Sequence, residues 1–519
     1  MSDLKINRRQ FGISAAAISA VTTLGLHGRR AKAAVGSPLK SRMNEDIQVL
    51  DPGYMIGGSE TTVQFATLPR LAIPVQDAGG TWTWAPSDYV SDISQGDDGN
   101  ISFTLKPGFM WSDGYGELTA EDVKFSFERM PATDWGGRWP TLDHVEVKDK
   151  YSGVIVVKSL FAPMWLIGIS SESGTILCKA AVEKLPEKRF TTELPAQCGP
   201  YTMVEWQPKE KIILKVNPDF PGTKPDFAEV HIVNIEDDKA AELAFEAGEV
   251  DITHVTPPTA KRYRESMPPD STLIQLPGPL ATWMGMNTEH EKLKDVRVRR
   301  AIQRAVDVDS IIEASYSGSS PKAFGIIPLG LLGYRPAAKY NYNPDEARAL
   351  LAEAGVSGLS LELKVLNDPA NTTSAQVIQA NLADVGIKVD IIPLDSGPYW
   401  NLGLEEQGED WKTLEIWIMR YRTSPDPHDM VQWFVGSQVG IWNWERWKDS
   451  EFDELFVNGQ AETDIEKRAQ GYLRMQEIME DTGAYLWITH EPAFFIHKNG
   501  FKPAFDSGAE PLVERYKLT

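Results

Sequence analysis

The stretch "LSLELKVLNDPANTTSAQVIQANLADVGIKVDIIPLD", residues 359–395, decides the fold class of this chain. Its two ends, residues 359–368 and 385–395, have the apolar pattern of strands, and residues 372–384 between them have that of a helix. A strand, a helix and a strand in this order predict a parallel βαβ unit. We therefore predict that the second half of the chain contains a mixed α/β domain.

The first half of the chain is richer in strands. Ile101, Phe103 and Leu105 alternate with polar residues, which is strand periodicity. A helix is predicted to begin after Thr119, where Asp122 three residues later completes a capping box with the shorter acid. Apolar strands cross between the two halves near residues 279–287 and 491–498, and we place the joints of the fold there.

The N-terminal residues 1–33 are predicted to be an export signal. A twin-arginine pair in "NRRQFG" (residues 7–12) precedes the uncharged run of residues 13–26 and the small-x-small cleavage site of residues 31–33. The alternative is a membrane anchor, but the run is too short and too rich in Ala, Ser and Thr to span a bilayer. We expect the mature protein in a bacterial periplasm or outside the cell.

The composition restricts the partners and the redox chemistry. A formal net charge of −21 argues against nucleic acid and anionic membrane surfaces, which both need a basic face. The chain has two cysteines, Cys178 and Cys198. In an oxidising compartment they form either one disulfide or two buried free thiols, and their separation in the sequence does not decide between these alternatives.

Catalytic signatures are absent from the sequence. It contains no G-x-S-x-G elbow, no H-E-x-x-H helix and no phosphate-binding G-x-x-x-x-G-K-[ST] loop. The eight histidines are scattered, without metal-ligand spacing. We therefore expect a binding protein with no cofactor, no metal and no enzymatic activity, and an exported hydrolase is the less favoured alternative.

Several ordered motifs give the chain a family resemblance. The stretches "FTLKPGFMWSDG" and "LTAEDVKFSFERM" (residues 103–130), together with "CGPYTMVEWQPKEKIILKVNPDF" (198–220), resemble the peptide/nickel/opine class of ABC-transporter solute-binding proteins, also called bacterial extracellular solute-binding protein family 5. The segments 283–312, 340–355 and 376–391 match the helices and the βαβ segment of that family's second lobe.

This resemblance implies a two-lobed periplasmic-binding-protein fold of type II. A two-strand hinge joins the lobes, ligand binds in the cleft between them, and an extra subdomain is inserted into lobe 1. Lobe 1 is expected at residues 34–282, with the subdomain at about 80–195. Lobe 2 is expected at 283–494, and residues 495–519 return to lobe 1. The implied partners are a small-molecule ligand and an ABC permease of the inner membrane, and we expect a monomer.

The stretch "IWIMRYRTSPDPHDM" (residues 416–430) is expected to line the cleft, because it matches a strand and loop of the family's second lobe. Peptide receptors of this class place an acidic residue just before the Asp-Pro step, here Asp426-Pro427. This chain has Thr423-Ser424-Pro425 there, preceded by Arg420 and Arg422. That departure argues against an ordinary di- or oligopeptide.

Strand alternation places Arg420 and Arg422 on one face, with Tyr421 opposite. Two guanidinium groups on one face favour a carboxylate, phosphate or sulfate. We expect at least one of them to lack an acidic partner in the open protein and to grip the ligand. The alternative is that they pair internally, with acids such as Asp426 or Asp429.

Aromatic residues follow, and flat indoles such as Trp442 and Trp444 suit a sugar ring or an apolar group, with interlobe core as the alternative. The predicted ligand is therefore small, polar and anionic, such as an acidic sugar conjugate, an opine-like compound or a modified acidic peptide. The alternatives are a dipeptide or oligopeptide, and a nickel chelate because of His428. The full set of candidate ligand-binding residues is Arg420, Arg422, Asp426, His428, Trp442, Trp444, Tyr54, Ser59 and Asn367.

Overall fold

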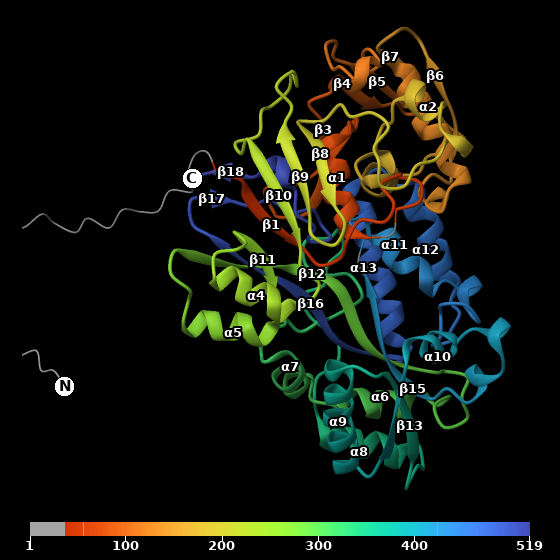
Figure 1. Cartoon of the computed structure of the whole chain (residues 1–519). Helices are drawn as coiled ribbons and strands as arrows, with labels where there is room; N and C mark the ends of the chain where they lie inside the picture. The colour runs from red at the N-terminus through yellow and green to blue at the C-terminus, as the bar shows by residue number, and fades with distance from the viewer. Residues whose placement is uncertain (1–36, 56, 423) are drawn as a thin grey trace, which may run out of the picture.

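The computed structural model describes residues 37–55, 57–422 and 424–519, and the predicted export signal lies outside them. The chain forms two lobes that share one central sheet (Figure 1). Two long strands, β12 (Ser271–Met286) and β16 (Tyr485–Lys498), pass from one lobe into the other. One end of this pair adjoins β11 (Ile252–Val255) of lobe 1, and the other adjoins β15 (Ile416–Arg422) of lobe 2.

The central sheet has ten strands in the order β14-β13-β15-β12-β16-β11-β1-β10-β9-β8. Its lobe 2 end contains the predicted βαβ unit. Strand β13 (Ser360–Leu366) and strand β14 (Lys388–Leu394) are parallel, and helix α9 (Pro369–Asp384) connects them. The prediction from residues 359–395 is therefore confirmed. The helix starts three residues earlier than predicted, because the Asp368 side chain caps it by accepting from the Asn371 N–H.

The two crossing strands change register where the lobes meet. Leu276 pairs with Ala493, and the next regular pair is Leu280 with Glu491. Gly278 lies in this irregular segment, where a Cβ atom would fall 2.2 Å from the Glu491 carbonyl oxygen. The backbones can approach this closely only because residue 278 has no side chain. The connection between the lobes is a two-strand hinge, as the fold prediction requires.

Lobe 1 contains the remaining strands of the central sheet and a separate four-stranded sheet of order β4-β5-β7-β6. Helix α2 (Ala120–Arg129) packs against this second sheet, and its predicted capping box between Thr119 and Asp122 is confirmed. The strands of lobe 1 are β1 (Leu39–Met43), β2 (Ala72–Gln76), β3 (Trp82–Pro86), β4 (Val90–Gln95), β5 (Ile101–Leu105), β6 (Leu142–Val147), β7 (Ser152–Val157), β8 (Tyr201–Gln207), β9 (Lys211–Val216), β10 (Glu229–Asn234), β17 (Phe501–Lys502) and β18 (Lys517–Leu518).

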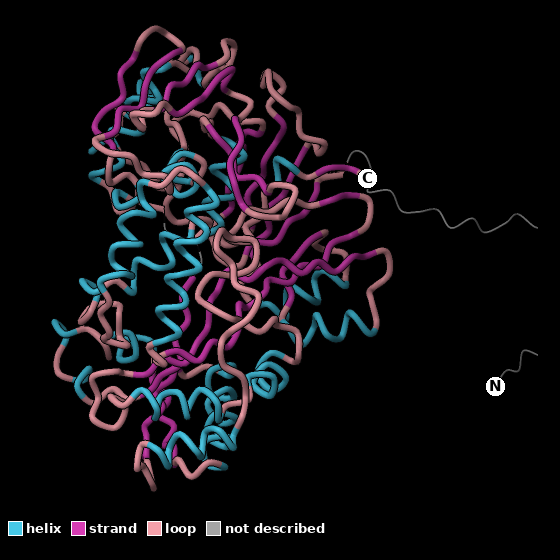
Figure 2. Tube along the Cα trace, turned by 180° about the vertical axis from the view of Figure 1, so that it is seen from behind, coloured by secondary structure: helices cyan, strands magenta, loops and turns pink. Residues whose placement is uncertain are grey.

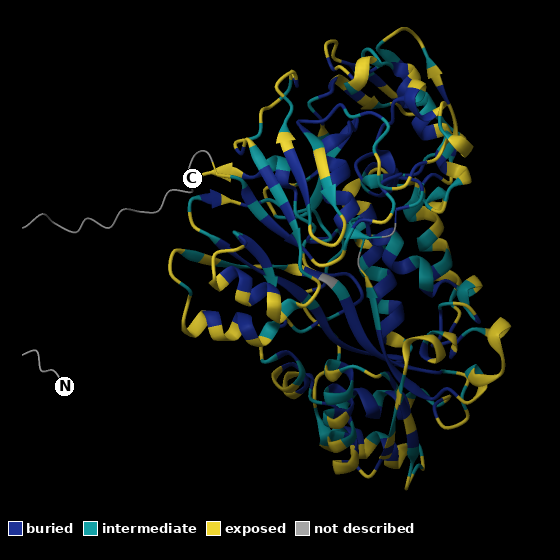
Figure 3. Cartoon of the chain, in the orientation of Figure 1, coloured by how far each residue is buried: buried dark blue, intermediate teal, exposed yellow. Residues whose placement is uncertain are grey.

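Helices cover the sheet in both lobes, as the view from behind shows (Figure 2). Separate apolar cores lie beneath them, two in lobe 1 and two in lobe 2, and the long central strands of the sheet are largely buried (Figure 3). The other helices are α1 (Gly58–Thr67), α3 (Lys179–Val182), α4 (Asp238–Glu246), α5 (Pro257–Glu265), α6 (Val296–Ala305), α7 (Val308–Tyr316), α8 (Pro344–Glu353), α10 (Ser396–Asn401), α11 (Pro427–Val431), α12 (Ser450–Ala461) and α13 (Ile465–Asp481). Among the described residues, none of these helices combines the length and apolar character needed to cross a membrane.

The lobes also touch away from the hinge. The Trp82 N–H, in β3 of lobe 1, donates to the Gly330 carbonyl of lobe 2 at 3.0 Å. The Ala162 N–H donates to the Gln460 carbonyl, at the end of α12, at 2.7 Å. These contacts bring the two lobes together around the space between them.

Candidate functional site

A cavity of about 370 Å³ lies between the lobes. Lobe 2 contributes Arg422 at the end of β15, followed by Ser424 and Pro425. Lobe 1 contributes the start of α1, the turn around residues 166–172 and the loop of residues 506–510. We call this space the interlobe cavity. Its volume is in the range of small-ligand sites in proteins.

Strand β15 carries Arg422 into the interlobe cavity. Its first four residues, Ile416–Met419, are buried in the middle of the sheet, which fixes the direction of the strand. Beyond them the strand emerges from the core, and the Arg422 side chain is 67% exposed. Pro425 and Pro427 then prevent the strand from continuing. The apolar run and the prolines thus place a solvated guanidinium at the mouth of the cavity.

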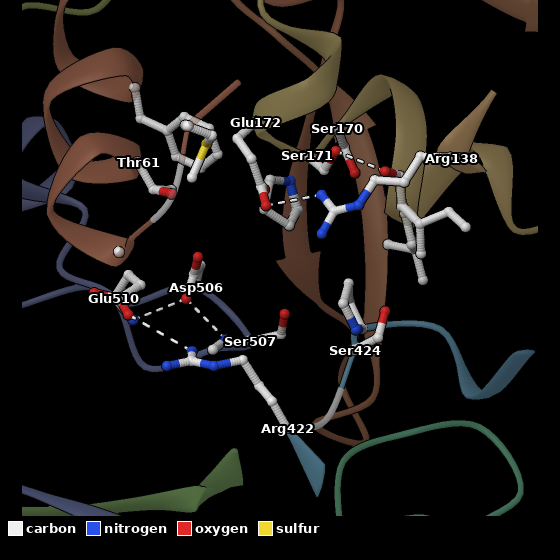
Figure 4. A pocket seen from close by; sticks show the side chains of 18 of the residues that line it. Thr61, Arg138, Ser170, Ser171, Glu172, Arg422, Ser424, Asp506, Ser507 and Glu510 are labelled. Atoms are coloured by element: carbon white, nitrogen blue, oxygen red, sulfur yellow. Dashed lines mark hydrogen bonds and ion pairs between the residues drawn. The ribbon is translucent and has the colours of Figure 1, made fainter. Parts of the chain in front are cut away.

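The loop of residues 506–510 faces Arg422 from lobe 1 (Figure 4). Asp506 shapes this loop, because its Oδ1 accepts from the N–H groups of Gly508 and Glu510, both at 2.8 Å. Oε1 of Glu510 lies 3.8 Å from Nη1 of Arg422. A carboxylate cluster on one lobe therefore faces a guanidinium on the other, at a distance longer than a direct hydrogen bond.

The two carboxyl groups of this loop have raised pKa values. Burial raises the pKa of Glu510 to about 8, and repulsion from Asp506 adds to this effect, while Arg422 opposes it. Burial likewise raises the pKa of Asp506 to about 6. A nearby positive charge would reverse both shifts, because it stabilises the ionised form. The loop is therefore suited to receive a cationic group.

The opposite wall carries a second charged pair and several hydroxyl groups. Nη1 of Arg138 donates to Oε1 of Glu172 at 2.7 Å, and its guanidinium stacks on the Trp135 ring with the centroid 4.2 Å away. Ser170 and Ser171 lie beside this pair (Figure 4). Because Glu172 bonds directly to Arg138 whereas Glu510 stays 3.8 Å from Arg422, Arg422 is the more available of these two described arginines for a ligand anion.

Comparison with known proteins identifies the family. Residues 87–441 match the model of the "Bacterial extracellular solute-binding proteins, family 5 Middle". The chain belongs to this family of solute-binding proteins. Its members are receptors of ABC transporters for peptides, nickel and opines, and they are not enzymes. This confirms the resemblance drawn from the sequence motifs.

Relatives and solved structures agree with this assignment. The chain is 27% identical, over 85% of its length and 86% of the relative's, to the probable D,D-dipeptide-binding periplasmic protein DdpA of Escherichia coli K12. HbpA2 of Haemophilus parasuis has the same fold, with a TM-score of 0.82, 20% identity and coverage of 93% and 100% of the two chains. The periplasmic binding protein AgaA of A. tumefaciens R10, solved with agropinic acid, matches with a TM-score of 0.70 and 22% identity, over 93% of this chain and 99% of AgaA.

In this solute-binding protein the two predicted arginines lie in different surroundings. Arg420 does not line the interlobe cavity, and its Nη1 lies 3.6 Å from Oε2 of Glu491 near the hinge. Each arginine has an acid within 4 Å, at 3.6 Å for Arg420 and 3.8 Å for Arg422, but neither contact is a direct hydrogen bond, so the expectation that one of them binds a ligand anion stays a prediction. The partners are neither Asp426 nor Asp429. Both acids come from segments distant in the sequence, which strand periodicity cannot reveal.

Asp426 is a structural residue of lobe 2, which corrects its prediction as a ligand-binding residue. Its two carboxylate oxygens accept from Nη1 and Nη2 of Arg468 at 2.9 and 2.7 Å, and Oδ1 also caps α11. The side chain is 1% exposed. A carboxylate that is this buried and accepts three hydrogen bonds from its own lobe is not accessible to a ligand in the cavity.

His428 is also buried and lies outside the interlobe cavity. Its ring stacks on Phe456 at 4.4 Å between centroids and meets the edge of Phe161 from lobe 1 at 5.5 Å. Burial lowers the pKa of His428 to about 4, so the ring is neutral near pH 7. Among the described residues, no group of three or more His, Cys, Asp and Glu side chains could hold a metal ion. His428 gives no support for a nickel-chelate site.

The predicted tryptophans belong to an aromatic cluster of lobe 2. Trp444 is buried and packs against Tyr399 and Trp417, and its Nε1 donates to the Ile441 carbonyl. Trp442 is half-buried beside Tyr421, whose hydroxyl donates to the Trp442 carbonyl. Neither lines the interlobe cavity. Trp444 belongs to the core of lobe 2, and Trp442 is half-buried against other aromatic rings, so the structure shows neither cavity residues nor the interlobe core given as the alternative.

The remaining candidates do not line the interlobe cavity either. The Arg189 guanidinium stacks on Tyr54 with the ring centroid 3.7 Å away. Ser59 is buried in α1 and donates to the Glu45 carbonyl. Asn367 is exposed just after β13. Of the nine predicted ligand-binding residues, the structure therefore brings only Arg422 into this cavity, and Thr423 beside it is outside the described residues.

The two cysteines are free and buried, so the structure contains two thiols in place of the disulfide. Burial raises the pKa of Cys178 to about 11, and it raises that of Cys198 further. Thiols in such surroundings are unreactive, since the thiolate is the reactive form.

The sequence reasoning missed the acidic side of the cavity. Asp506 and Glu510 stand in "FDSGAEP", an acidic turn in the C-terminal segment that was assigned to lobe 1 without a role in the site. The Asp-Ser-Gly signal of a tight turn was available. The position of this turn opposite Arg422 could not be predicted, because residues 422 and 506 are distant in the sequence and come together only in the folded protein.

Proposed function

We propose that this solute-binding protein is a periplasmic receptor for a small zwitterionic ligand of the dipeptide kind, which it delivers to the permease of an ABC importer. One observation carries the proposal: Arg422 of lobe 2 faces Asp506 and Glu510 of lobe 1 across a single cavity. The guanidinium suits a ligand carboxylate, which it can bind through two hydrogen bonds. The two carboxyl groups suit a ligand ammonium.

This proposal changes the ligand class expected from the sequence. Two arginines on one strand face favoured an anion, but Arg420 does not line the cavity and Arg138 is neutralised by Glu172. A ligand with only negative charge would sit beside Asp506 and Glu510 and be repelled by them. An ammonium group removes this conflict. The printed name of the relative DdpA, a probable D,D-dipeptide-binding protein, supports the same class.

An opine-like conjugate is the second candidate. The hydroxyl groups of Ser170, Ser171 and Ser424 line the cavity and suit the hydroxyls of a sugar-derived ligand. The AgaA structure, solved with agropinic acid, supports this alternative at the level of the fold. The two candidates share a carboxylate for Arg422 and differ in the rest of the ligand.

Export by the twin-arginine route is part of the proposal. The pair Arg8-Arg9 precedes an uncharged run and a small-x-small site, which supports cleavage after residue 33. Replacing both arginines by lysine is expected to leave the precursor in the cytoplasm. Normal periplasmic yield from that variant would show that the general secretory route is used.

Native mass spectrometry of the protein purified from its own compartment tests the proposed function. We expect one bound molecule per chain, carrying both a carboxylate and a cationic nitrogen, and released unchanged after incubation. A bound molecule without a cationic group would contradict the zwitterion, and turnover of the released molecule would contradict a receptor.

A further inference from the structure

A second cavity, of about 340 Å³, lies inside lobe 1. Its walls are the end of α1, residues 86–89, the start of β8 with the loop after β9, and the C-terminal residues 514–517. We call it the Arg70 cavity. No residue of lobe 2 lines it. It touches the interlobe cavity through one shared side chain, that of Phe65.

Arg70 is a buried cation without a hydrogen-bonded partner in the part of the chain that the structure describes. It is 4% exposed, and its Nη1 is buried with no acceptor in reach. Its guanidinium stacks 3.3 Å from the centroid of the Phe65 ring, which holds it in place. Among the described residues, the one carboxylate within 4.0 Å is that of Glu514, at 3.9 Å. This distance is too long for a hydrogen bond.

Glu514 and Arg515 are also incompletely paired. Both carboxylate oxygens of Glu514 are buried and accept no hydrogen bond from a described residue. Nε of Arg515 lies 3.5 Å from Oε1 of Glu514, and its Nη2 is buried without an acceptor. Its Nη1 is the one that is satisfied, by the Pro74 carbonyl at 2.9 Å. Three charged side chains thus converge on one cavity, and each has at least one buried polar atom without a hydrogen-bond partner among the described residues.

The charge of this group is unbalanced. Two guanidiniums share one carboxylate, which leaves one positive charge in excess. Asp88 also lines the cavity and keeps its negative charge, because its hydrogen bond comes from the neutral Thr223 N–H, but among the described residues it forms no ion pair with Arg70 or Arg515; Lys517 pairs with Asp226. Burial and the neighbouring Arg515 lower the pKa of Arg70 to about 9, although Glu514 opposes this effect. An uncompensated buried charge is costly unless an opposite charge joins it.

We propose that the Arg70 cavity is a second ligand site, which binds a small oxyanion between Arg70 and Arg515. The anion is a carboxylate or a phosphate, because the planar guanidinium groups match both through paired hydrogen bonds. Leu68, Ile73 and Phe220 line the same space, so a carboxylate with a short apolar part also fits. The site is separate from the interlobe cavity and does not depend on the ligand class proposed there.

The test is calorimetric titration and thermal melting of the full-length mature protein. Sodium phosphate and sodium acetate are the two probes, each added at constant ionic strength. We expect a saturable rise in melting temperature with at least one probe, and the better probe identifies the source of the anion. A rise that never saturates is general salt exclusion from the surface. Such a rise, or none, with both probes overturns the proposal.

Variants with opposite expected signs make the test specific. Arg515→Gln should weaken anion binding roughly tenfold or more, because it removes a charge-assisted hydrogen bond. Glu514→Gln should tighten it by about the same factor, because it removes the competing carboxylate. A purely structural role would give weaker binding in both variants. Arg70→Gln should abolish anion binding. If this variant does not fold, the opposite effects expected for Arg515→Gln and Glu514→Gln still test the proposal.

Two controls locate the anion. Arg348→Gln changes an exposed arginine of α8 that pairs with Asp345, and it should leave anion binding unchanged. Arg422→Gln removes the arginine that lobe 2 contributes to the interlobe cavity, and it should also leave anion binding in the Arg70 cavity unchanged. Loss of the anion response in Arg422→Gln, with retention in Arg515→Gln, would place the anion between the lobes and overturn the proposal.

Discussion

Nη1 of Arg422 lies 3.8 Å from Oε1 of Glu510, and the two residues belong to different lobes. At this distance Arg422 attracts the ionised form of Glu510, but no direct hydrogen bond occupies the donors and acceptors of the two groups. A ligand can therefore enter between the two groups and bind both. The same pair would then hold the lobes together through the ligand, which is how a two-lobed receptor closes.

Arg422 and Arg420 form a matched pair for mutation. Truncating one partner of a desolvated charge pair typically costs about 2–5 kcal/mol, so Arg422→Gln should weaken binding of a dipeptide by roughly thirty-fold or more. Its effect on stability should be small, because the free side chain is solvated. Arg420→Gln should change affinity much less, since Arg420 pairs with Glu491 outside the cavity. Calorimetric titration and thermal melts compare them, and equal losses of affinity would contradict this assignment.

Ligand binding is expected to release a proton. The pKa of Glu510 is about 8 in the free protein, so most of its carboxyl groups are protonated at pH 7. A ligand ammonium stabilises the carboxylate and lowers this pKa. Affinity should therefore rise with pH up to about 8 and fall as pH drops below it. Titrations at pH 7 in buffers of different ionisation enthalpy measure the released proton, and a buffer-independent heat would contradict the role of Glu510.

Glu510→Gln distinguishes the effect of this carboxyl group on stability from its effect on ligand affinity. The folded-state pKa lies above the unfolded value, so the folded protein holds more protons and loses stability as pH rises from about 4.5 to 8. The variant removes that loss, and we expect its free energy of unfolding to increase over that of the wild type more at pH 8 than at pH 5. Its affinity for a ligand ammonium should fall. Thermal melts at pH 5 and pH 8 check the first effect, and an equal change at both pH values would contradict it.

Asp426→Asn is expected to reduce stability and leave ligand affinity unchanged, the reverse of Arg422→Gln. It leaves the buried Arg468 without its ionic partner, which typically costs about 3–5 kcal/mol of stability. The affinity of the folded fraction for ligand should stay close to that of the wild type, because Asp426 does not face the interlobe cavity. Chemical unfolding gives the stability, and titration of folded protein gives the affinity. A variant of normal stability with lost affinity would return Asp426 to the binding site.

The two thiols give a further check on the structure. Cys178 and Cys198 are buried with raised pKa values, so a thiol reagent should label neither in the native protein. After unfolding without a reductant, both should be labelled. Failure to label the unfolded protein would show that the cysteines are joined in a disulfide.

Local sequence patterns predicted the elements of this fold well. The βαβ unit of residues 359–395 follows from hydrophobic periodicity alone, and the Thr119–Asp122 capping box follows from two residues three apart. The two-lobed arrangement came from the family resemblance of ordered motifs. The βαβ unit and the capping box could be predicted because the interactions that form them lie between residues close in the sequence.

The site was predicted less well, because its residues come from distant segments. Arg422 was found from an apolar run that ends in a charge, whereas Asp506 and Glu510 lie over eighty residues further on and face it only after folding. Asp426 and Trp444 were misassigned for a related reason. A conspicuous charged or aromatic residue can serve the core as readily as the ligand, and only the fold shows which partners it meets.

Calorimetric titration with one dipeptide in three forms tests the central claim most directly. The free dipeptide has both charged ends, the N-acetylated form lacks the ammonium, and the amidated form lacks the carboxylate. We predict that the free dipeptide binds one to one, and that blocking either end weakens binding by roughly thirty-fold or more. Full affinity for the N-acetylated form would show that the carboxylates of residues 506 and 510 hold no ligand cation, and would contradict the zwitterion receptor.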